Sequence, residues 1–420
     1  MKERINSLKK SVFFRNAGIL ISGTALSQSI PLLISPVITR LYDPASFGVF
    51  AIYISVITIL LTISTGRYEK AIVIPSEIET SKRLTVLSQS LIVLFTAFLF
   101  VIVHFFGAPV LSILNISGLI PFVYLIPIGV LLMASDQSAY HWANKIEKYK
   151  RMSFSKVASN LSSGTLQIVL GFFKLEALGL IAAKLTGLFV SYIILISTFK
   201  LSDFLSYKLN EIKSVAKRYI LFPKYLMSAH LLNSIALNSP PIILAFYFNE
   251  TEIGFFGLTQ RAIMLPVSIV SRSVGDVFRQ KAVDDLNKDG NCKKIYKQTF
   301  WGLLIAGIIP FLILLFLSPW LFKLVFGTEW ETAGNYAQIL SVLFLFQFVS
   351  APFNNMFLIR EKQKLELLWQ VLFFISSTVS IFVGYYIFKT ITGALIIFAL
   401  SRSVSYLLGI FMTSKLTVKQ

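Results

Sequence analysis

Apolar residues gather in long runs along this chain, and polar residues gather in short stretches between the runs. A run of about 20 apolar residues is long enough to cross the hydrocarbon core of a bilayer as a helix. The pattern therefore predicts an all-α integral membrane protein with twelve transmembrane helices. Their expected bounds are residues 16–38, 46–65, 85–106, 119–139, 153–173, 177–199, 225–248, 253–274, 299–322, 334–357, 366–387 and 391–413.

The distribution of Lys and Arg between the predicted loops indicates how the chain crosses the membrane. An even number of helices places both termini on one side. That side holds 32 of the 39 Lys and Arg when Lys156 and Arg272, which lie near helix ends, are counted with its loops, and basic loops mark the cytoplasmic side. We therefore expect cytoplasmic N- and C-termini. The opposite loops hold four basic residues, Arg40, Lys174, Lys323 and Lys389. The remaining three, Lys184, Arg261 and Arg402, lie within helices.

Two turns of the chain resemble each other at a shift of 206 residues, which predicts an internal repeat. LYDPASFGVFAI (residues 41–52) follows the first helix, and YFNETEIGFFGL (residues 247–258) follows the seventh. We expect a six-helix bundle at 1–199, a cytoplasmic linker at 200–224 and a second six-helix bundle at 225–420. Two six-helix bundles of the same orientation imply a pseudo-twofold axis along the membrane normal, with a site between them near the midplane.

Composition supports the membrane assignment and excludes several kinds of chemistry. Hydrophobic residues make up 55% of the chain and charged residues 14%, with a mean hydropathy of +0.73, whereas soluble domains carry about 25% charged residues. The net charge of +19 fits basic cytoplasmic loops better than nucleic-acid binding. Cys292 is the single cysteine, and the three histidines match no metal-ligand spacing. The basic N-terminal stretch precedes a segment too long for a signal peptide, so we expect an uncleaved first helix.

No sequence feature predicts an enzyme. The chain lacks the GxxxxGK[ST] pattern that cradles nucleotide phosphates, has no carboxylate pair at hydrolase spacing and shows no soluble catalytic segment. We expect neither a cofactor nor a metal ion.

The stretch GRYEKAIVIP (residues 66–75) places three charges directly after the second apolar run. A charged side chain at bilayer depth costs about 2.5–3.5 kcal/mol, so such residues usually face a bundle interior or an aqueous cavity. Arg67, Glu69 and Lys70 are therefore candidates for a cavity site. The alternative is that these charges only mark the cytoplasmic end of a helix.

Polar residues also lie inside the first and seventh predicted helices, which are equivalent in the repeat. Small residues such as Ser22, Gly23 and Ser27 favour helix packing. A polar face would be costly in lipid, so larger amides and an imidazole favour a cavity wall. These candidate cavity residues are Gln28, His230, Asn233 and Asn238.

Basic residues within the predicted helices outnumber the acids that could neutralise them, which indicates a cavity suited to an anionic substrate. The candidate substrate-binding cations are Arg67, Lys70, Arg261, Lys184, Arg402 and Arg40. Asp136 and Glu69 are the candidate acids for charge balance or ion coupling. The alternatives are that Lys184 and Arg402 snorkel or pair near helix ends, and that Arg40 anchors the outer interface.

Four stretches of this chain resemble the polysaccharide-export flippases of the Wzx type. They are residues 13–48, RYEKAIVIP at 67–75, SVGDVFRQKA at 273–282 and FGTEWETAGNYAQIL at 326–340. The resemblance spans both halves, and it implies a fold like that of the multidrug and toxin extrusion (MATE) exporters and the lipid II flippases.

The resemblance also implies a function: moving undecaprenyl-pyrophosphate-linked oligosaccharide across the bacterial inner membrane by alternating access, for O-antigen, lipopolysaccharide or other surface polysaccharide biosynthesis. Arg67 and Glu69 fall on the family's charged motif, whereas no family signature assigns Lys184, Arg261 or Arg402. Implied partners are the lipid-linked glycan, membrane lipids, a polysaccharide polymerase and a chain-length regulator, with no nucleic acid.

Three other functions compete with this interpretation. A MATE-type drug/cation antiporter would need an acid-rich cavity, which the excess of cations argues against. A glycan polymerase or membrane glycosyltransferase would carry a long outer loop or a soluble catalytic segment. A membrane scaffold without transport activity would leave the charges within the helices unexplained.

Overall fold

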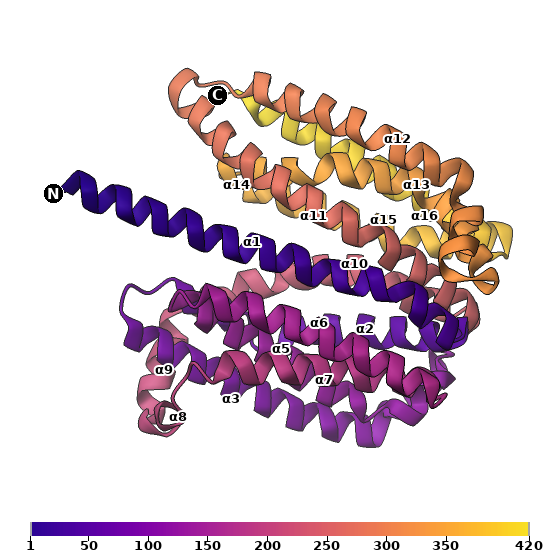
Figure 1. The fold of residues 1–420 in the computed structure, drawn as a ribbon, viewed down its shortest axis with the longest axis horizontal. Helices are drawn as coiled ribbons and strands as arrows, with labels where there is room; N and C mark the ends of the chain where they lie inside the picture. The colour runs from indigo at the N-terminus through magenta and orange to yellow at the C-terminus, as the bar shows by residue number, and fades with distance from the viewer. Residues whose placement is uncertain (1, 419–420) are drawn as a thin grey trace. The chain divides into compact units, whose positions relative to one another are not determined.

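The computed structural model describes residues 2–418, and helices make up nearly all of them (Figure 1). Each of the twelve predicted apolar runs falls on a helix, which confirms the all-helical fold. The main helices are α1 (Lys2–Leu41), α2 (Pro44–Ser64), α3 (Ile78–Ile102), α5 (Leu125–Lys145), α6 (Tyr149–Phe172), α7 (Glu176–Ile196), α10 (Met227–Ala245), α11 (Glu250–Asp289), α12 (Lys293–Phe326), α13 (Glu331–Ser350), α15 (Gln363–Phe388) and α16 (Ile391–Ser414).

Shorter helical turns connect or extend these helices. They are η1 (Tyr68–Val73), η2 (Val103–Gly107), α4 (Ala108–Ile113), η3 (Ser117–Phe122), α8 (Leu201–Ser206), α9 (Leu209–Arg218), η4 (Phe222–Leu226), η5 (Thr328–Trp330), η6 (Ala351–Asn354), α14 (Asn355–Ile359) and η7 (Lys415–Thr417).

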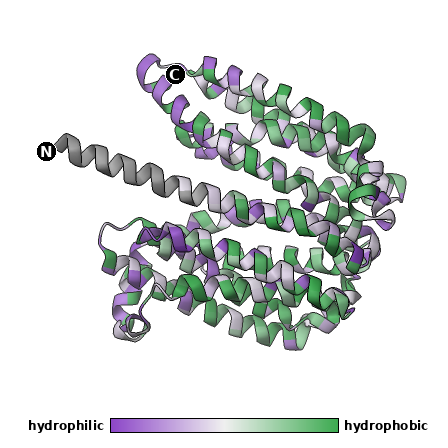
Figure 2. Cartoon of the chain, viewed as in Figure 1, coloured by the Kyte–Doolittle hydropathy of each residue, from purple (hydrophilic) through white to green (hydrophobic). Residues whose placement is uncertain are grey.

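Eight helical segments within residues 2–418 are long and apolar enough to cross a membrane. Helices α1, α5, α6 and α10 also coincide with predicted spans but are not among these eight segments. These helices carry polar residues such as Gln28, Asp136, Asn160 and His230. Side chains of this kind lower the mean hydropathy of a helix that is still partly buried in the bundle. Figure 2 shows the apolar character of most helices and the polar turn between α11 and α12.

Several predicted bounds differ from the observed ones. The predicted helix at 119–139 begins later, at Leu125, because the chain first forms the short turn η3, which contains Pro121. Helix α11 continues past residue 274 to Asp289, where Gly290 ends it in the left-handed conformation at φ 66°. The residues between the eighth and ninth predicted spans are therefore largely helical.

The chain forms two compact units, Met1–Leu231 and Leu232–Gln420. In the first unit, α1 packs along α6, α6 along α7, and α5 against α2, α3 and α7. Gly187 of α7 lies close to the α6 backbone, because a Cβ there would stand 2.6 Å from the Ser159 carbonyl oxygen. Small residues allow this close approach of two helices in a membrane protein.

In the second unit, α13 packs against α11, α12 and α16, and α15 packs against α16. The core of this unit is rich in aromatic residues, and Trp330, Phe256, Phe398 and Phe353 are fully buried.

The repeated turns adopt the same local structure in both units. Asp43 caps α2 by accepting a hydrogen bond from the Ser46 N–H at 2.9 Å, and Asn249 caps α11 by accepting one from the Glu252 N–H at 3.0 Å. These residues correspond at the 206-residue shift. The side-chain oxygen at an N-cap satisfies an N–H group that has no partner within the helix. The sequence repeat is therefore also a structural repeat at these two helix starts.

Candidate functional site

Residues 66–70, which follow α2, form a sharp corner that holds a buried ion pair. We call these residues the Arg67 corner. Gly66 and Arg67 both adopt the left-handed conformation, at φ 57° and φ 65°. This conformation costs a non-glycine residue about 1–2 kcal/mol, so the surrounding structure must hold Arg67 in place. The corner turns the chain from α2 into η1 and directs the Arg67 and Glu69 side chains into the unit.

Arg67 and Glu69 pair with each other in the interior of the first unit. Arg67 is 8% exposed and Glu69 is 1% exposed, and their closest side-chain nitrogen and oxygen are 3.2 Å apart. The Thr65 hydroxyl donates a short hydrogen bond to the other Glu69 oxygen and accepts one from the Arg67 N–H at 3.1 Å. The Arg67 Nε has no hydrogen-bond partner among residues 2–418. The guanidinium therefore retains a donor for a further acceptor.

Three further groups surround this pair. Lys70 is half-buried, and burial lowers the pKa of its ammonium group; the Glu69 charge opposes this shift and the Arg67 charge adds to it. His141 of α5 and His230 of α10 both lie within electrostatic reach of Arg67 and Lys70. Two cations and one carboxylate leave this site with a net positive charge when the imidazoles are neutral.

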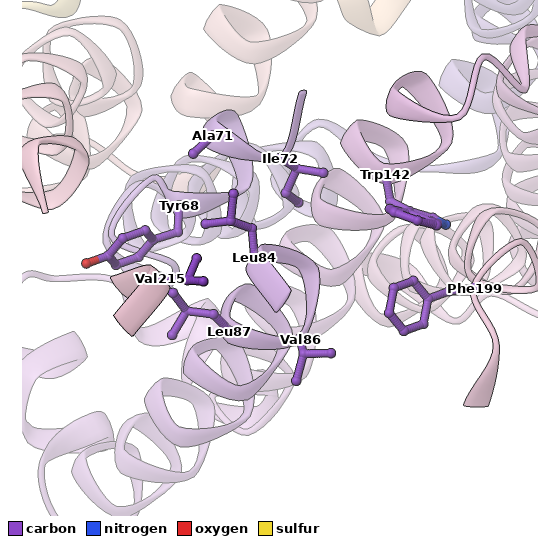
Figure 3. Close-up of a cluster of buried hydrophobic side chains, with 9 residues drawn as sticks. All are labelled: Tyr68, Ala71, Ile72, Leu84, Val86, Leu87, Trp142, Phe199 and Val215. Carbon is purple, nitrogen blue, oxygen red and sulfur yellow. The ribbon is translucent and has the colours of Figure 1, made fainter. Parts of the chain in front are cut away.

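The segment before the second unit holds this corner from one side. The Tyr68 hydroxyl donates to the Ala216 carbonyl oxygen of α9 at 2.9 Å. Val215 of α9 lies in the same buried cluster as Tyr68, Ile72 and Leu87, as Figure 3 shows. A Cβ on Gly66 would stand 3.2 Å from the Pro223 Cβ. Residues far apart in the chain therefore fix the position of the Arg67 corner.

A second polar group in the first unit surrounds Asp136 of α5. Ser191 of α7 hydrogen-bonds to this carboxylate, and Lys184 and Lys156 lie within electrostatic reach. The Lys156 ammonium stands 4.7 Å from the centre of the Tyr140 ring and 3.4 Å from the Thr24 hydroxyl. A carboxylate with two lysines could exchange ions or protons within the helical bundle.

Residues near this group connect α1 to α6. The Asn160 amide donates to both the carbonyl and the hydroxyl oxygen of Ser27, at 2.7 and 2.8 Å. Ser27 therefore serves helix packing, and Gln28 beside it is half-buried.

Arg402 of α16 is the most enclosed candidate cation of the second unit. It is 4% exposed, and its guanidinium carbon lies 4.2 Å from the Phe373 ring centre and within 5.6 Å of the Phe398 and Tyr406 ring centres. It donates to the Tyr406 hydroxyl at 2.9 Å and to the Ala236 carbonyl at 3.4 Å. Aromatic faces stabilise a buried cation through their quadrupoles.

The other predicted residues occupy different positions. Arg40 is exposed and donates to the Pro36 carbonyl at 2.6 Å. Arg261, Asn233 and Asn238 are half-buried in the second unit, and the Asn238 amide donates to the Ser234 carbonyl one turn earlier. The structure thus brings together Arg67, Glu69, Lys70 and His230, and separately Asp136 and Lys184.

Sequence reasoning did not select His141, Lys156 or Thr65 for these sites. Lys156 lies inside the predicted span 153–173, so its charge within a helix was a usable signal. His141 and Thr65 had no such signal, because only the fold places His141 within electrostatic reach of Arg67 and orients the Thr65 hydroxyl toward Glu69. No group of three or more His, Cys, Asp or Glu in residues 2–418 could hold a metal ion.

A family model described as a polysaccharide biosynthesis protein matches residues 37–333. The chain belongs to this polysaccharide biosynthesis family. The match covers most of the chain, including the Arg67 corner and the Asp136 group, and it confirms the resemblance found in the sequence. No curated protein matches the sequence.

Solved structures of transporters share the fold of this family member. The lipid II flippase MurJ in an inward closed conformation is 12% identical with a TM-score of 0.72, over 94% of this chain and 87% of that chain. An inward-facing multidrug resistance MATE family transporter of the MOP superfamily is 13% identical with a TM-score of 0.64, over 93% of both chains.

A third neighbour is a MOP superfamily transporter from Pyrococcus furiosus whose binding pocket is described as having reversed polarity. It is 14% identical with a TM-score of 0.53, over 95% of this chain and 94% of that chain. Together these neighbours confirm the predicted MATE-like fold of a multi-pass membrane protein.

Proposed function

We propose that this protein is a flippase that moves undecaprenyl-pyrophosphate-linked oligosaccharide from the cytoplasmic to the outer leaflet of the bacterial inner membrane. The observation that carries the proposal is the buried Arg67 corner in a member of a polysaccharide biosynthesis family. Surface polymers such as O-antigen and lipopolysaccharide are assembled from such lipid-linked units, and no chemical step is required of the flippase.

The charge balance of the corner suits an anionic head group. Glu69 neutralises one of the two cations, Arg67 and Lys70, so one positive charge remains. The Arg67 Nε is buried and has no hydrogen-bond partner among the described residues, so a substrate reaches it only when the site opens during the cycle. A pyrophosphate could accept from this donor and pair with Lys70, because guanidinium and ammonium groups both bind phosphate oxygens strongly. Arg261, Lys184, Arg402 and Arg40 remain further candidates for substrate contact.

The transport cycle we propose is alternating access. The pyrophosphate head enters from the cytoplasmic leaflet and pairs with the corner, the glycan occupies a water-filled cavity that opens during the cycle, and the lipid tail stays in the bilayer. Protonation or ion binding at Glu69 or Asp136 drives the return step. Polar side chains such as Gln28, His230, Asn233 and Asn238 are our candidates for hydrogen bonds to the glycan, which offers many hydroxyl groups.

A drug/cation antiporter is the second candidate, and the observation that favours it is Asp136. One oxygen of this carboxylate has no hydrogen-bond partner among the described residues. A carboxylate within the bundle could bind a cationic drug or a coupling ion. The nearby Lys184 and Lys156 argue against a cationic substrate, because they would repel it.

Deleting the gene in its native host separates the two functions. The flippase proposal predicts that surface polysaccharide disappears and that lipid-linked repeat units accumulate facing the cytoplasm. Complementation with Arg67→Gln should then fail, whereas Arg151→Gln should restore the polymer. Arg151 is an exposed arginine that donates to the Ser197 hydroxyl, so it controls for the loss of an arginine. Unchanged surface polymer together with increased sensitivity to toxic cations would instead establish the antiporter.

A further inference from the structure

The segment between α7 and α10 folds as two short helices at one end of the first unit (Figure 1). Only residues 197–200 separate the end of α7 from the start of α8. Because α7 crosses the membrane, such a short link keeps α8 and α9 close to the bilayer surface. The outer face of the segment is therefore within reach of the membrane surface.

The acidic residues of this segment pair with the protein, whereas its basic residues face outward. Its two acidic residues both pair with basic residues of α3: Asp203 with Lys82 at 3.2 Å, and Glu211 with Arg83 at 2.9 Å. Its basic residues are all exposed: Lys200, Lys208, Lys213, Lys217, Arg218 and Lys224. The outer face therefore carries an excess of positive charge that no acid of the segment offsets.

Helix α9 shows the separation of an inner apolar side from an outer basic side most clearly. Val215 is buried on its inner side, whereas Lys213 and Lys217 stand one turn apart on the exposed side. Like charges at this spacing destabilise a helix by a few tenths of a kcal/mol. No ion pair within residues 2–418 involves either lysine. A repulsive pair of this kind indicates an anionic partner outside the protein.

Apolar residues flank the basic face at both ends. Leu209 at the start of α9 is 66% exposed, and Leu221 just after it is 61% exposed, with Ile220 and Tyr225 also exposed. Water is an unfavourable environment for such side chains. Helices that lie in a membrane interface combine basic residues with exposed apolar residues in this way.

We propose that the outer face of α9, with Lys213 and Lys217 at its centre, binds the head groups of anionic membrane phospholipids. The lysines pair with phosphate oxygens, and Leu209, Leu221 and Tyr225 enter the acyl boundary. Basic clusters beside a membrane-spanning helix attract anionic lipids in this manner. The inference goes beyond the proposed function, because it concerns a different surface and a different lipid.

This surface is connected to the Arg67 corner through the thickness of one helix. The inner side of α9 supplies Val215 to the cluster around Tyr68, and the Ala216 carbonyl accepts from the Tyr68 hydroxyl. A lipid bound outside α9 therefore helps to hold the same helix against η1. The lipid composition of the membrane would then affect the corner without touching it.

The test titrates delipidated full-length protein in neutral detergent with short-chain phosphatidylglycerol and, in parallel, phosphatidylcholine of equal chain length. Bound lipids are counted by native mass spectrometry. Each lysine near an anionic surface contributes about a factor of five in affinity, so the K213Q/K217Q variant should bind phosphatidylglycerol about 25-fold more weakly. Its binding of phosphatidylcholine should not change, and added salt should reduce the difference between the proteins.

The matched control is K281Q/K288Q on α11. Both lysines are exposed, but Asp284, Asp285 and Asp289 lie beside them on the same helix. This variant should retain wild-type binding. Equal binding of both lipids by the wild-type protein, equal loss in the control variant, or complete displacement of phosphatidylglycerol by inorganic phosphate would each overturn the proposal.

A variant that impairs polymer export in cells but binds phosphatidylglycerol normally would also overturn it, in favour of an acidic protein partner. The binding measurement needs no translocation, so its failure would leave the proposed flippase function untouched.

Discussion

The starts of α2 and α11 are alike, but the ends of these helices differ. Both helices begin with the same type of cap, at Asp43 and Asn249. After Ser64, the chain leaves α2 and forms the left-handed corner with its buried ion pair. At the equivalent positions α11 continues as an unbroken helix through Ser273 and Gly275 to Asp289. The two units therefore match at the starts of these helices and differ where the first unit buries charged side chains.

This difference indicates that the first unit carries a charged site that has no counterpart at the equivalent positions of α11. The Arg67 corner requires two consecutive left-handed residues, a buried carboxylate and contacts from α9. None of these features has a counterpart in α11, where the residues equivalent to Arg67 and Glu69 are Ser273 and Gly275. The costly local structure of the first unit is what would be expected of a functional site. The following predictions test that contrast.

Removing one member of the ion pair should have the largest effect. Arg67→Ala leaves the Glu69 carboxylate buried without its cation, and breaking a buried pair in this way costs about 3–5 kcal/mol. The Ser273→Ala substitution at the equivalent position of α11 should change stability by less than about 0.5 kcal/mol. Thermal unfolding of the two purified variants in detergent measures both. Similar melting temperatures would mean that the pair contributes little to the corner.

Adding a methyl group at a glycine of the corner and at a glycine in the matching part of α11 should have opposite effects. Gly66→Ala forces alanine into φ 57° beside Pro223, which should cost about 1–2 kcal/mol. Gly275→Ala lies in a regular helix, where the new Cβ would stand 3.5 Å from the Asn355 amide nitrogen, so the variant should gain about 0.5–1 kcal/mol. Chemical unfolding curves compare the two. A stabilising Gly66→Ala substitution would contradict the described corner.

The two helix caps should contribute equally to the stability of the two units. Asp43→Ala and Asn249→Ala each remove the side-chain acceptor for an N–H group at a helix start. Each should cost about 1 kcal/mol. Unfolding measurements on the two single variants and the double variant test this, and the two effects should add because the caps belong to different units. A clear difference between the single variants would show that the repeat is not energetically equivalent.

The smallest expected effect concerns Lys70 and depends on pH. Burial lowers the pKa of this lysine in the folded protein, so folding is penalised wherever the group must carry its charge. The penalty is fully present below the lowered folded pKa and disappears as pH rises to the ordinary value of 10.5. Lys70→Met should therefore raise the melting temperature slightly at pH 7 while weakening export. The gain should shrink toward pH 10.5; a gain independent of pH would assign it to packing.

The sequence predicted the helical architecture because apolar run length and basic loops directly reflect the bilayer. It also made Arg67, Glu69 and Lys70 candidate site residues, since three charges after an apolar run are unusual. It could not predict that Gly66 and Arg67 turn the chain so that Arg67 and Glu69 face inward, because left-handed conformations depend on tertiary support from residues such as Pro223 and Ala216.

Other site residues illustrate the same limit. His141 and Lys156 become relevant only when α5 and α6 bring them beside Arg67 and Asp136. Arg402 was recognised as a charge within a helix, yet the aromatic rings around it come from both α15 and α16. Spacing within one helix cannot show which residues of another helix will cover it.

We propose that the Arg67 charge acts on substrate at its own position and does not serve only as a structural partner of Glu69. The most direct test is translocation of a fluorescent lipid-linked oligosaccharide by proteoliposomes that contain the charge-swapped double variant Arg67→Glu with Glu69→Arg. Melting temperature is measured beside it. We predict that the swap recovers much of the stability lost in Arg67→Ala while translocation stays near background. Translocation at the wild-type rate by the swapped protein would contradict the claim.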